Sequence, residues 1–185
     1  MDSNSKPKPP LDTMRELSLD LNLPDSDATL LLGAALARGL PPSAARCGVV
    51  AYLRGELGAG KTTCVRSLLR ALGVTAKVRS PTYTLVDTYD LAAWTCVHVD
   101  LYRLRAPYEV LELGLADMAG PRSMLLIEWP ENGGAAVPPA DIEIVLRYRE
   151  QGRQAHVQAA TPLGREWLSN LGLDTSLAPY LSNLT

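Results

Sequence analysis

Hydrophobic positions along the chain follow the spacing of strands in some segments and of helices in others. Val49–Leu53 is a continuous apolar run of the length expected for a buried parallel strand. Between Lys61 and Leu72 the apolar positions recur at helical spacing, and Gly73 closes that segment. Thr13–Leu23 alternates apolar and polar residues, which predicts a half-buried strand that Pro24 ends.

The same two patterns predict the remaining elements. A helix is expected from a cap at Asp25, Ser26 or Asp27 to Gly39, a residue suited to a left-handed C-terminal turn. Pro41–Cys47 is expected to be a loop. Strands interleaved with helices indicate an α/β sandwich. The further strands are predicted at Thr84–Tyr89, Thr95–Val99, Ser123–Ile127, Asp141–Tyr148 and Gln154–Ala159, and the shorter helices at Tyr108–Leu113 and Gly164–Leu171.

The length of 185 residues fits one domain, which we expect to span residues 12–172. Residues 1–11 are dominated by Ser, Asn, Lys and Pro, a composition that predicts a disordered tail. Residues 173–185 are weakly patterned and are expected to form a C-terminal tail that lies loosely on the surface.

Composition narrows the class of protein. The longest apolar runs are far shorter than a bilayer span, which excludes an integral membrane protein, and no apolar segment follows Lys6 and Lys8 as in a secretory signal. Three cysteines without C-x-x-C spacing predict neither a disulfide framework nor a zinc site, so we expect a cytoplasmic location. The net charge of −2 lacks the basic footprint of a protein that binds nucleic acid unaided.

The segment Gly55–Thr62 (GELGAGKT) matches the phosphate-binding loop G-x-x-x-x-G-K-[ST], between a predicted strand and a predicted helix. Glycines let backbone N–H groups turn around phosphates, and the helix N-terminus adds unpaired donors. Lys61 is expected to reach the β- and γ-phosphates, and the Thr62 hydroxyl to bind Mg²⁺. The loop therefore predicts an ATP site built from Glu56, Leu57, Gly58, Ala59, Gly60, Lys61, Thr62 and Thr63.

Two predicted strands end in acids. Glu128 follows Ser123–Ile127 at the sheet edge where phosphates bind in open α/β folds, which makes it the Walker B candidate, either a Mg²⁺ ligand or a group that orients water. Asp100 ends the segment after Val99 and is a weaker candidate for the same metal shell. His98 is expected to be a packed, hydrogen-bonded imidazole rather than a catalytic base.

Three further positions remain open from their residues alone. Ser80–Thr84 is predicted to be either a plain turn or a loop that senses the γ-phosphate through Thr82 or Thr84. Trp129 is expected to pack in the core or to lie near a nucleotide or a partner. Cys64 is predicted to be a small buried hydrophobic residue.

Four segments together resemble the bacterial TsaE family, the P-loop ATPases of tRNA threonylcarbamoyladenosine biosynthesis. Their order and spacing match from about Leu21 to Ala159, which makes the resemblance far more specific than the phosphate loop alone. The segments are LRGELGAGKTTCV at Leu53–Val65, SPTYTLV at Ser80–Val86, HVDLYRL at His98–Leu104 and LIEWPE at Leu126–Glu131.

The resemblance implies a P-loop NTPase-like three-layer sandwich with a mixed, mostly parallel sheet, and weak Mg²⁺-dependent ATPase activity that depends on partners. Those partners are TsaD and TsaB, which transfer threonylcarbamoyl to tRNA, so contact with tRNA is expected to be indirect. ATP hydrolysis would reset that complex between turnovers. The family's functional positions fall on Lys61, Thr62, Thr82, Asp100, Glu128 and Trp129, with Lys61, Glu128 and Asp100 as catalytic groups and Thr62, Glu128 and Asp100 around the metal.

Other functions stay open at this point. Many P-loop proteins of this size are small-molecule kinases, although Arg103 and Arg105 are the only arginine pair near the site that could serve as a lid. A GTPase-like switch would need a guanine-specific N-K-x-D segment, which the chain lacks. Direct tRNA binding would require a local basic face, for which Arg66, Arg70, Arg79, Arg103 and Arg105 are the candidates.

Overall fold

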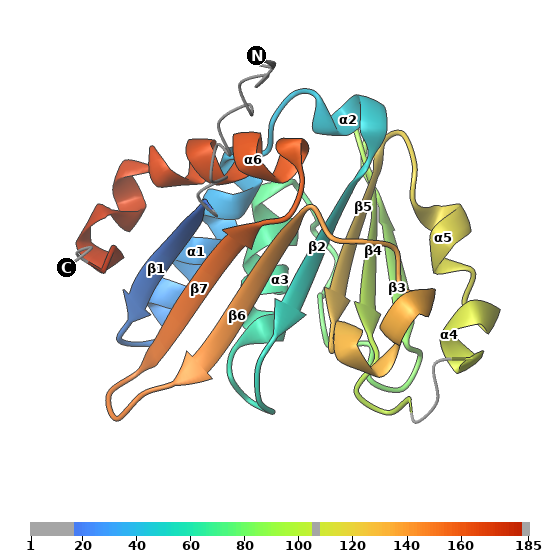
Figure 1. Cartoon of the computed structure of the whole chain (residues 1–185), viewed down its shortest axis with the longest axis horizontal. Coiled ribbons are helices and arrows are strands. Elements are labelled where there is room, and N and C mark those ends of the chain that lie inside the picture. Colours follow the sequence, from blue (N-terminus) through green and yellow to red (C-terminus); the bar gives the residue numbers. More distant parts are fainter. Residues whose placement is uncertain (1–16, 105–107, 183–185) are drawn as a thin grey trace, which may run out of the picture.

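A seven-stranded sheet in the order β1-β7-β6-β2-β5-β4-β3 forms the centre of the protein (Figure 1). The structure is a computed structural model, and it describes residues 17–104 and 108–182. The strands are β1 (Ser18–Leu23), β2 (Val49–Arg54), β3 (Val86–Asp90), β4 (Thr95–Asp100), β5 (Ser123–Glu128), β6 (Ile142–Tyr148) and β7 (Arg153–Ala159).

The middle of the sheet is parallel and its borders are antiparallel. β2 pairs in parallel with both β6 and β5, and β5 pairs in parallel with β4. β7 runs antiparallel to β6 and to β1, and β3 runs antiparallel to β4. β1 therefore points the same way as the four central strands, which confirms the predicted mixed, mostly parallel sheet.

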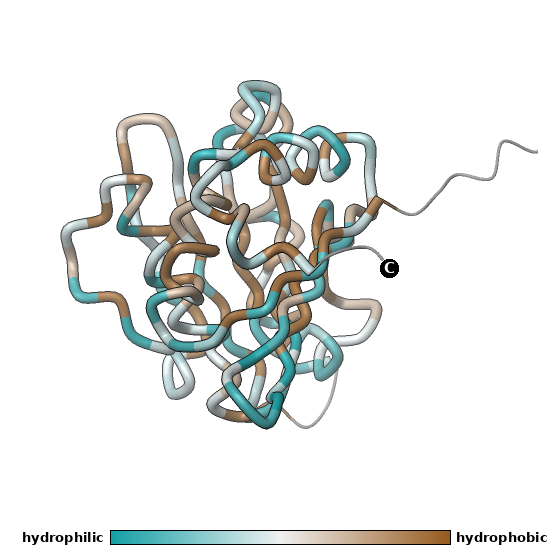
Figure 2. The backbone as a smooth tube through the Cα atoms, turned by 90° about the vertical axis from the view of Figure 1, so that its left-hand side faces the viewer, coloured by the Kyte–Doolittle hydropathy of each residue, from teal (hydrophilic) through white to brown (hydrophobic). Residues whose placement is uncertain are grey.

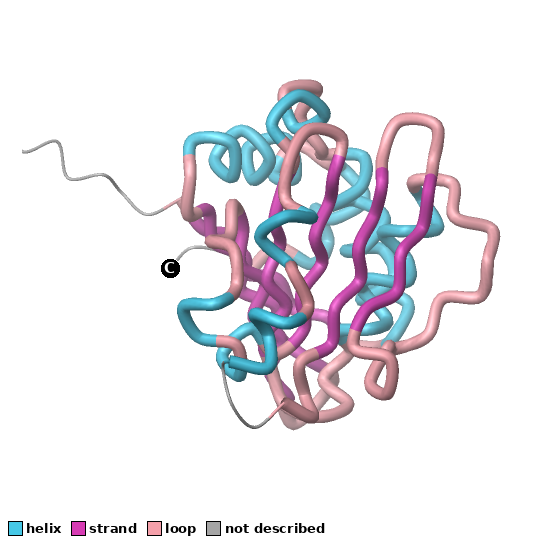
Figure 3. The backbone as a smooth tube through the Cα atoms, turned by 90° about the vertical axis from the view of Figure 1, so that its right-hand side faces the viewer, coloured by secondary structure: helices cyan, strands magenta, loops and turns pink. Residues whose placement is uncertain are grey.

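Helices cover both faces of the sheet, as Figures 1 and 3 show, so the predicted three-layer arrangement is confirmed. One face packs against α1, α3 and α6 and the other against α4 and α5. The helices are α1 (Ser26–Arg38), α2 (Ala44–Cys47), α3 (Lys61–Ala71), α4 (Tyr108–Glu112), α5 (Leu115–Met118) and α6 (Pro162–Gly172), and the short 3-10 turns are η1 (Pro130–Asn132), η2 (Gly134–Ala136) and η3 (Thr175–Tyr180).

The two central strands are apolar because both of their faces are covered. β5 is buried at every position and β2 at all but its last, Arg54. In Figure 2 the hydrophobic positions run through the interior of the molecule. Cys64 on α3 is fully buried as predicted, and burial raises the pKa of its thiol to about 12, which makes it an unreactive core residue.

Several predicted boundaries need correction. The predicted left-handed turn at Gly39 is wrong, because this residue caps α1 in the right-handed region (φ −77°). Its small size instead allows a close approach to the backbone of α6. The segment Pro41–Cys47 is no simple loop, because α2 forms at its end. β3 begins at Val86 rather than Thr84. Of the predicted first strand, Ser18–Leu23 forms β1, Leu17 is described but lies outside the strand, and residues 13–16 lie outside the described residues. The expected tail over residues 1–11 lies outside the described residues.

The described part of the C-terminal segment, up to Ser182, packs on the sheet instead of lying loosely on the surface as expected. Leu177 in η3 is buried, and Leu181 forms a β-bridge with Leu21 of the edge strand β1. The Ser182 N–H donates to the Asp20 carbonyl at 2.8 Å. The segment therefore covers the open edge of the sheet, a contact between distant residues that the weak local pattern did not reveal.

Among the described residues, no helix combines the length and the hydrophobicity needed to cross a membrane.

Gly33 lets α1 approach α3 closely, and its replacement by alanine is expected to lower the free energy of unfolding by about 1–3 kcal/mol. A Cβ at this position would lie 2.2 Å from the Cys64 carbonyl oxygen, so one helix backbone must shift. Gly172→Ala in α6 is the matched control, since its Cβ would meet only Leu19 methyl groups at 3.7 Å or more. Urea unfolding of both variants tests this, and equal stability would contradict the close approach.

Candidate active site

The segment Gly55–Thr62 joins β2 to α3 as predicted, and it is called the phosphate-binding loop after the motif that it carries. Two of its glycines have physical reasons to be glycine. Gly55 has a φ of +135° and Gly58 a φ of +79°, both in the region that L side chains avoid. A Cβ on Gly55 would lie 2.1 Å from the Leu146 carbonyl oxygen, and one on Gly58 would lie 2.6 Å from the Tyr148 hydroxyl. The loop is therefore wrapped tightly against the end of β6 and leads directly into the N-terminus of α3.

Lys61 begins α3 and is almost completely buried, with 4% of its surface exposed. Its ammonium donates to the carbonyl oxygens of Gly55 at 2.6 Å and Glu56 at 2.9 Å. The Lys61 Nζ also lies 4.0 Å from the centre of the Trp129 ring, a cation–π distance. Burial lowers the pKa of Lys61, while the nearby carboxylates of Glu128 and Asp100 oppose that shift.

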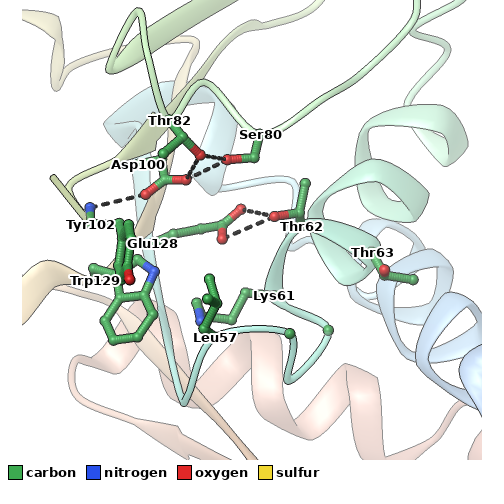
Figure 4. Close-up of a pocket in the computed structure, with 12 residues that line it drawn as sticks. Leu57, Lys61, Thr62, Thr63, Ser80, Thr82, Asp100, Tyr102, Glu128 and Trp129 are labelled. Carbon is green, nitrogen blue, oxygen red and sulfur yellow. Dashed lines mark hydrogen bonds between the residues drawn. The ribbon is translucent and has the colours of Figure 1, made fainter.

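Glu128 is the last residue of β5, and its carboxylate faces the first turn of α3. The Thr62 hydroxyl lies 2.9 Å from Glu128 Oε1 and 3.1 Å from Oε2, so its proton is shared between them (Figure 4). Only 2% of Glu128 is exposed. A threonine hydroxyl and a carboxylate at this distance are hard oxygen donors of the kind that Mg²⁺ binds.

Asp100 ends the neighbouring strand β4, directly opposite Glu128 in the register of the sheet. Its Oδ2 accepts hydrogen bonds from the hydroxyls of Ser80 and, at 2.9 Å, Thr82, and these two hydroxyls also contact each other. Its Oδ1 accepts from the Tyr102 N–H at 3.0 Å. Asp100 thus holds the Ser80–Thr82 segment through Oδ2 and the start of the loop after β4 through Oδ1.

A cavity of about 280 Å³ opens between these groups. Trp129 lies along one side in a left-handed conformation (φ 58°), which is unusual for a bulky residue, and its ring contacts Tyr102 at 5.1 Å between centroids. Trp129 therefore belongs to the site rather than to the core alone. The residues lining the cavity are Leu57, Gly58, Gly60, Lys61, Thr62, Thr63, Ser80, Thr82, Asp100, Tyr102, Glu128 and Trp129.

Most of the residues predicted to bind the nucleotide line this cavity, but two do not. Glu56 is exposed and offers only its carbonyl oxygen to Lys61, and Ala59 is fully buried in the core. Thr63 lies further along α3 and points away from the carboxylates in Figure 4. The Thr84 hydroxyl donates a hydrogen bond to Asp87 Oδ1 at 3.2 Å and is not part of the hydrogen-bonded group of Ser80, Thr82 and Asp100.

Sequence reasoning missed two side chains that come from the β6–β7 hairpin. The Tyr148 hydroxyl donates to the Leu57 carbonyl at 3.1 Å, which ties the hairpin to the phosphate-binding loop. Arg153 lies beside Gly60, where a Cβ would be 3.4 Å from its Nε, and this buried Nε has no hydrogen-bond partner among the described residues. No local signal marks either residue, because only the pairing of β6 with β2 brings the hairpin to the loop.

The buried charges of the site favour a divalent cation. Lys61, Glu128 and Asp100 are each less than 5% exposed, so one basic and two acidic side chains are withdrawn from water together. An excess of buried negative charge is unfavourable unless a cation or protons offset it. The oxygen donors of Thr62 and Glu128 are of the kind that Mg²⁺ binds. Among the described residues, no group of three or more His, Cys, Asp or Glu side chains is gathered so as to hold a metal ion, at this site or elsewhere.

Known proteins with similar sequences or folds agree with this architecture. A family model described as "Threonylcarbamoyl adenosine biosynthesis protein TsaE" matches residues 23–156. The tRNA threonylcarbamoyladenosine biosynthesis protein TsaE of Haemophilus influenzae is 39% identical over 152 residues, which cover 82% of this chain and 96% of that protein. The TsaE protein of Synechocystis is 39% identical over 121 residues, 64% of this chain and 74% of that protein.

The fold has a match among solved structures. The crystal structure of Bacillus subtilis YdiB superposes with a TM-score of 0.67, covering 85% of this chain and 95% of that one at 23% sequence identity. That likeness supports the fold, while the family model and the sequence relatives show the family. The family model spans most of the chain and includes the phosphate-binding loop, the Ser80–Thr82 segment and both strand-end acids, and the chain therefore belongs to the TsaE family of tRNA threonylcarbamoyladenosine biosynthesis proteins.

Proposed function

We propose that the chain is the ATP-binding and ATP-hydrolysing subunit of the tRNA threonylcarbamoyladenosine machinery. The observation that carries this proposal is the contact of Thr62, at the end of the phosphate-binding loop, with the buried carboxylate of Glu128. A loop followed by a hydroxyl beside a carboxylate is the arrangement that P-loop NTPases use for a nucleotide with Mg²⁺.

Each group has a task in this proposal. The N–H groups at the start of α3 bind phosphate oxygens, and Lys61 exchanges its carbonyl partners Gly55 and Glu56 for the β- and γ-phosphates. Thr62 and Glu128 would hold Mg²⁺, directly or through water. When bound, the metal neutralises charge on the phosphates as the terminal phosphoryl group leaves.

The Ser80–Thr82 segment connects nucleotide occupancy to the protein surface. Ser80 and Thr82 line the cavity while their hydroxyls bond to Asp100. A terminal phosphate in the cavity would compete for these hydroxyl protons, so the segment would differ between the ATP and ADP states. Tyr83 follows directly and is 83% exposed, which makes the segment available to a partner protein.

The family membership suggests the partners. We infer that the chain acts with TsaD and TsaB in the cytoplasm, that hydrolysis resets their complex between rounds of threonylcarbamoyl transfer, and that tRNA is contacted through them. The net charge of −2 favours indirect contact with tRNA.

The test is ATP hydrolysis by the protein alone, with TsaB and TsaD, and with both partners and tRNA. We expect slow hydrolysis alone and strong stimulation by the partners, which Lys61→Ala abolishes. Nucleotide binding without any stimulation would contradict the role in this complex. Transfer of the γ-phosphoryl group to a metabolite, detected with labelled ATP, would instead indicate a small-molecule kinase.

A further inference from the structure

His98 is a buried side chain directly behind the proposed metal ligand. It lies on β4 with none of its surface exposed. It shares a sheet face with Cys96, which belongs to the same apolar cluster as Val65 of α3, so this is the face that α3 covers. In the register of the sheet His98 stands opposite Leu126, two residues before Glu128 on β5. The His98 Nε2 lies 2.9 Å from Glu128 Oε1, so the imidazole touches the carboxylate and does not line the cavity.

The Glu128 carboxylate is held from two sides. Thr62 contacts both of its oxygens from α3, and His98 contacts Oε1 from β4. A carboxylate with one hydrogen-bonding neighbour can rotate about its terminal bond, whereas a second fixed donor selects one orientation. Partners of this kind, behind a metal ligand, typically set both its orientation and its affinity for the metal.

The environment of His98 also determines where its proton lies. An ionised carboxylate only accepts hydrogen bonds, so Nε2 must donate to Glu128. The Nδ1 atom is buried and has no hydrogen-bond partner among the described residues. A proton on Nδ1 would be an unpaired buried donor, which is costly, so the favoured form carries its proton on Nε2 and a lone pair on Nδ1.

We propose that His98 is a positioning residue whose Nε2–H keeps the Glu128 carboxylate facing Thr62 and thereby sets the Mg²⁺ affinity of the nucleotide site. This inference rests on the proposed function, because it assumes that Mg²⁺ and a nucleotide bind in the cavity. A purely structural histidine would fill the same space between β4 and α3 without affecting the metal.

Two amide variants separate these roles. In His98→Gln the side-chain nitrogen falls near the position of Nε2 and can still donate to Glu128. In His98→Asn the shorter side chain brings its nitrogen near the position of Nδ1, out of reach of the carboxylate. His156→Asn is the control, because His156 is the other histidine of the chain and contacts Asp20 rather than Glu128. The side chains of both His156 and Asp20 are partly exposed.

The readout is binding of fluorescent ADP, measured without metal and at increasing Mg²⁺ concentration. Mg²⁺ is expected to strengthen ADP binding, and the measured quantity is the Mg²⁺ concentration that gives half of this effect. We expect His98→Asn to raise that concentration by about 10- to 100-fold and to leave ADP binding without metal unchanged. His98→Gln should stay near the parent, as should His156→Asn. Equal Mg²⁺ dependence in the Asn variant and the parent would overturn the proposal, as would equal losses in the Asn and Gln variants.

A nucleotide that fails to bind the parent protein would contradict the proposed function instead, and the two failures are therefore distinguishable.

The tautomer of His98 provides a second test, which needs no folded variant of His98. With two histidines in the chain, ¹⁵N-edited spectra of the parent protein report the protonated nitrogen of each imidazole, and His156→Asn assigns them. We expect the His98 proton on Nε2, and a proton on Nδ1 alone would overturn the proposal.

Discussion

Lys61→Ala is expected to weaken ATP binding by about 100- to 1000-fold, from the loss of about 3–4 kcal/mol of charge-assisted hydrogen bonding to phosphate. Lys61 is buried at the base of the cavity, where its ammonium already bonds to two loop carbonyls and lies 4.0 Å from the Trp129 ring. These contacts hold the cation at the loop before any phosphate is bound. Alanine removes the charge and leaves the Gly55 and Glu56 carbonyls without this donor.

The control for this variant is Lys77→Ala. Lys77 is exposed, lies outside the cavity lining and carries the same charge, so its loss changes the net charge without changing the site. Binding is measured by titration calorimetry with ATP and Mg²⁺, and thermal unfolding verifies that both variants fold. Undiminished ATP affinity in a folded Lys61→Ala protein would refute the assignment of this loop to phosphate binding.

The local patterns in the sequence predicted the part of the site that is contiguous along the chain. The all-apolar β2, the glycine loop and the helical spacing of α3 each follow from a short segment, and the acids that end β4 and β5 are visible as strand-terminal residues. Because the carboxyl ends of neighbouring parallel strands meet at one edge of a sheet, Asp100 and Glu128 could be expected near the loop.

Features that depend on distant residues were not predictable in the same way. The Tyr148 and Arg153 side chains reach the loop only because β6 pairs with β2, an order that no local pattern determines. Likewise, the weakly patterned C-terminal segment docks because the edge of β1 offers free backbone groups to Leu181 and Ser182. Sequence periodicity reports which face of an element is buried, but not which element will bury it.

The structure also separates two acids that the sequence analysis placed in one metal shell, with Asp100 as the weaker candidate. Glu128 contacts Thr62, the hydroxyl at the end of the phosphate-binding loop, whereas Asp100 uses both of its oxygens to hold the Ser80–Thr82 segment and Tyr102. On this geometry Glu128 is the direct candidate for the metal. Among the described residues, the Asp100 carboxylate accepts hydrogen bonds only from the Ser80–Thr82 segment and Tyr102, so we expect it to act through that segment and not as a metal ligand.

The pair Glu128→Gln and Asp100→Asn tests this separation, since each change removes one charge and keeps the shape. We expect Glu128→Gln to lower ATP hydrolysis by about 100-fold or more and to raise the Mg²⁺ requirement at least about tenfold, because the amide is a poor metal ligand. Asp100→Asn should lower hydrolysis while leaving the Mg²⁺ requirement within about threefold of the parent, because the lost contacts lie in the Ser80–Thr82 segment. Hydrolysis measured across a Mg²⁺ series, with metal-free ADP binding as the check on folding, gives both quantities. A larger shift in Mg²⁺ requirement for Asp100→Asn than for Glu128→Gln would reverse the two assignments and make Asp100 the metal ligand.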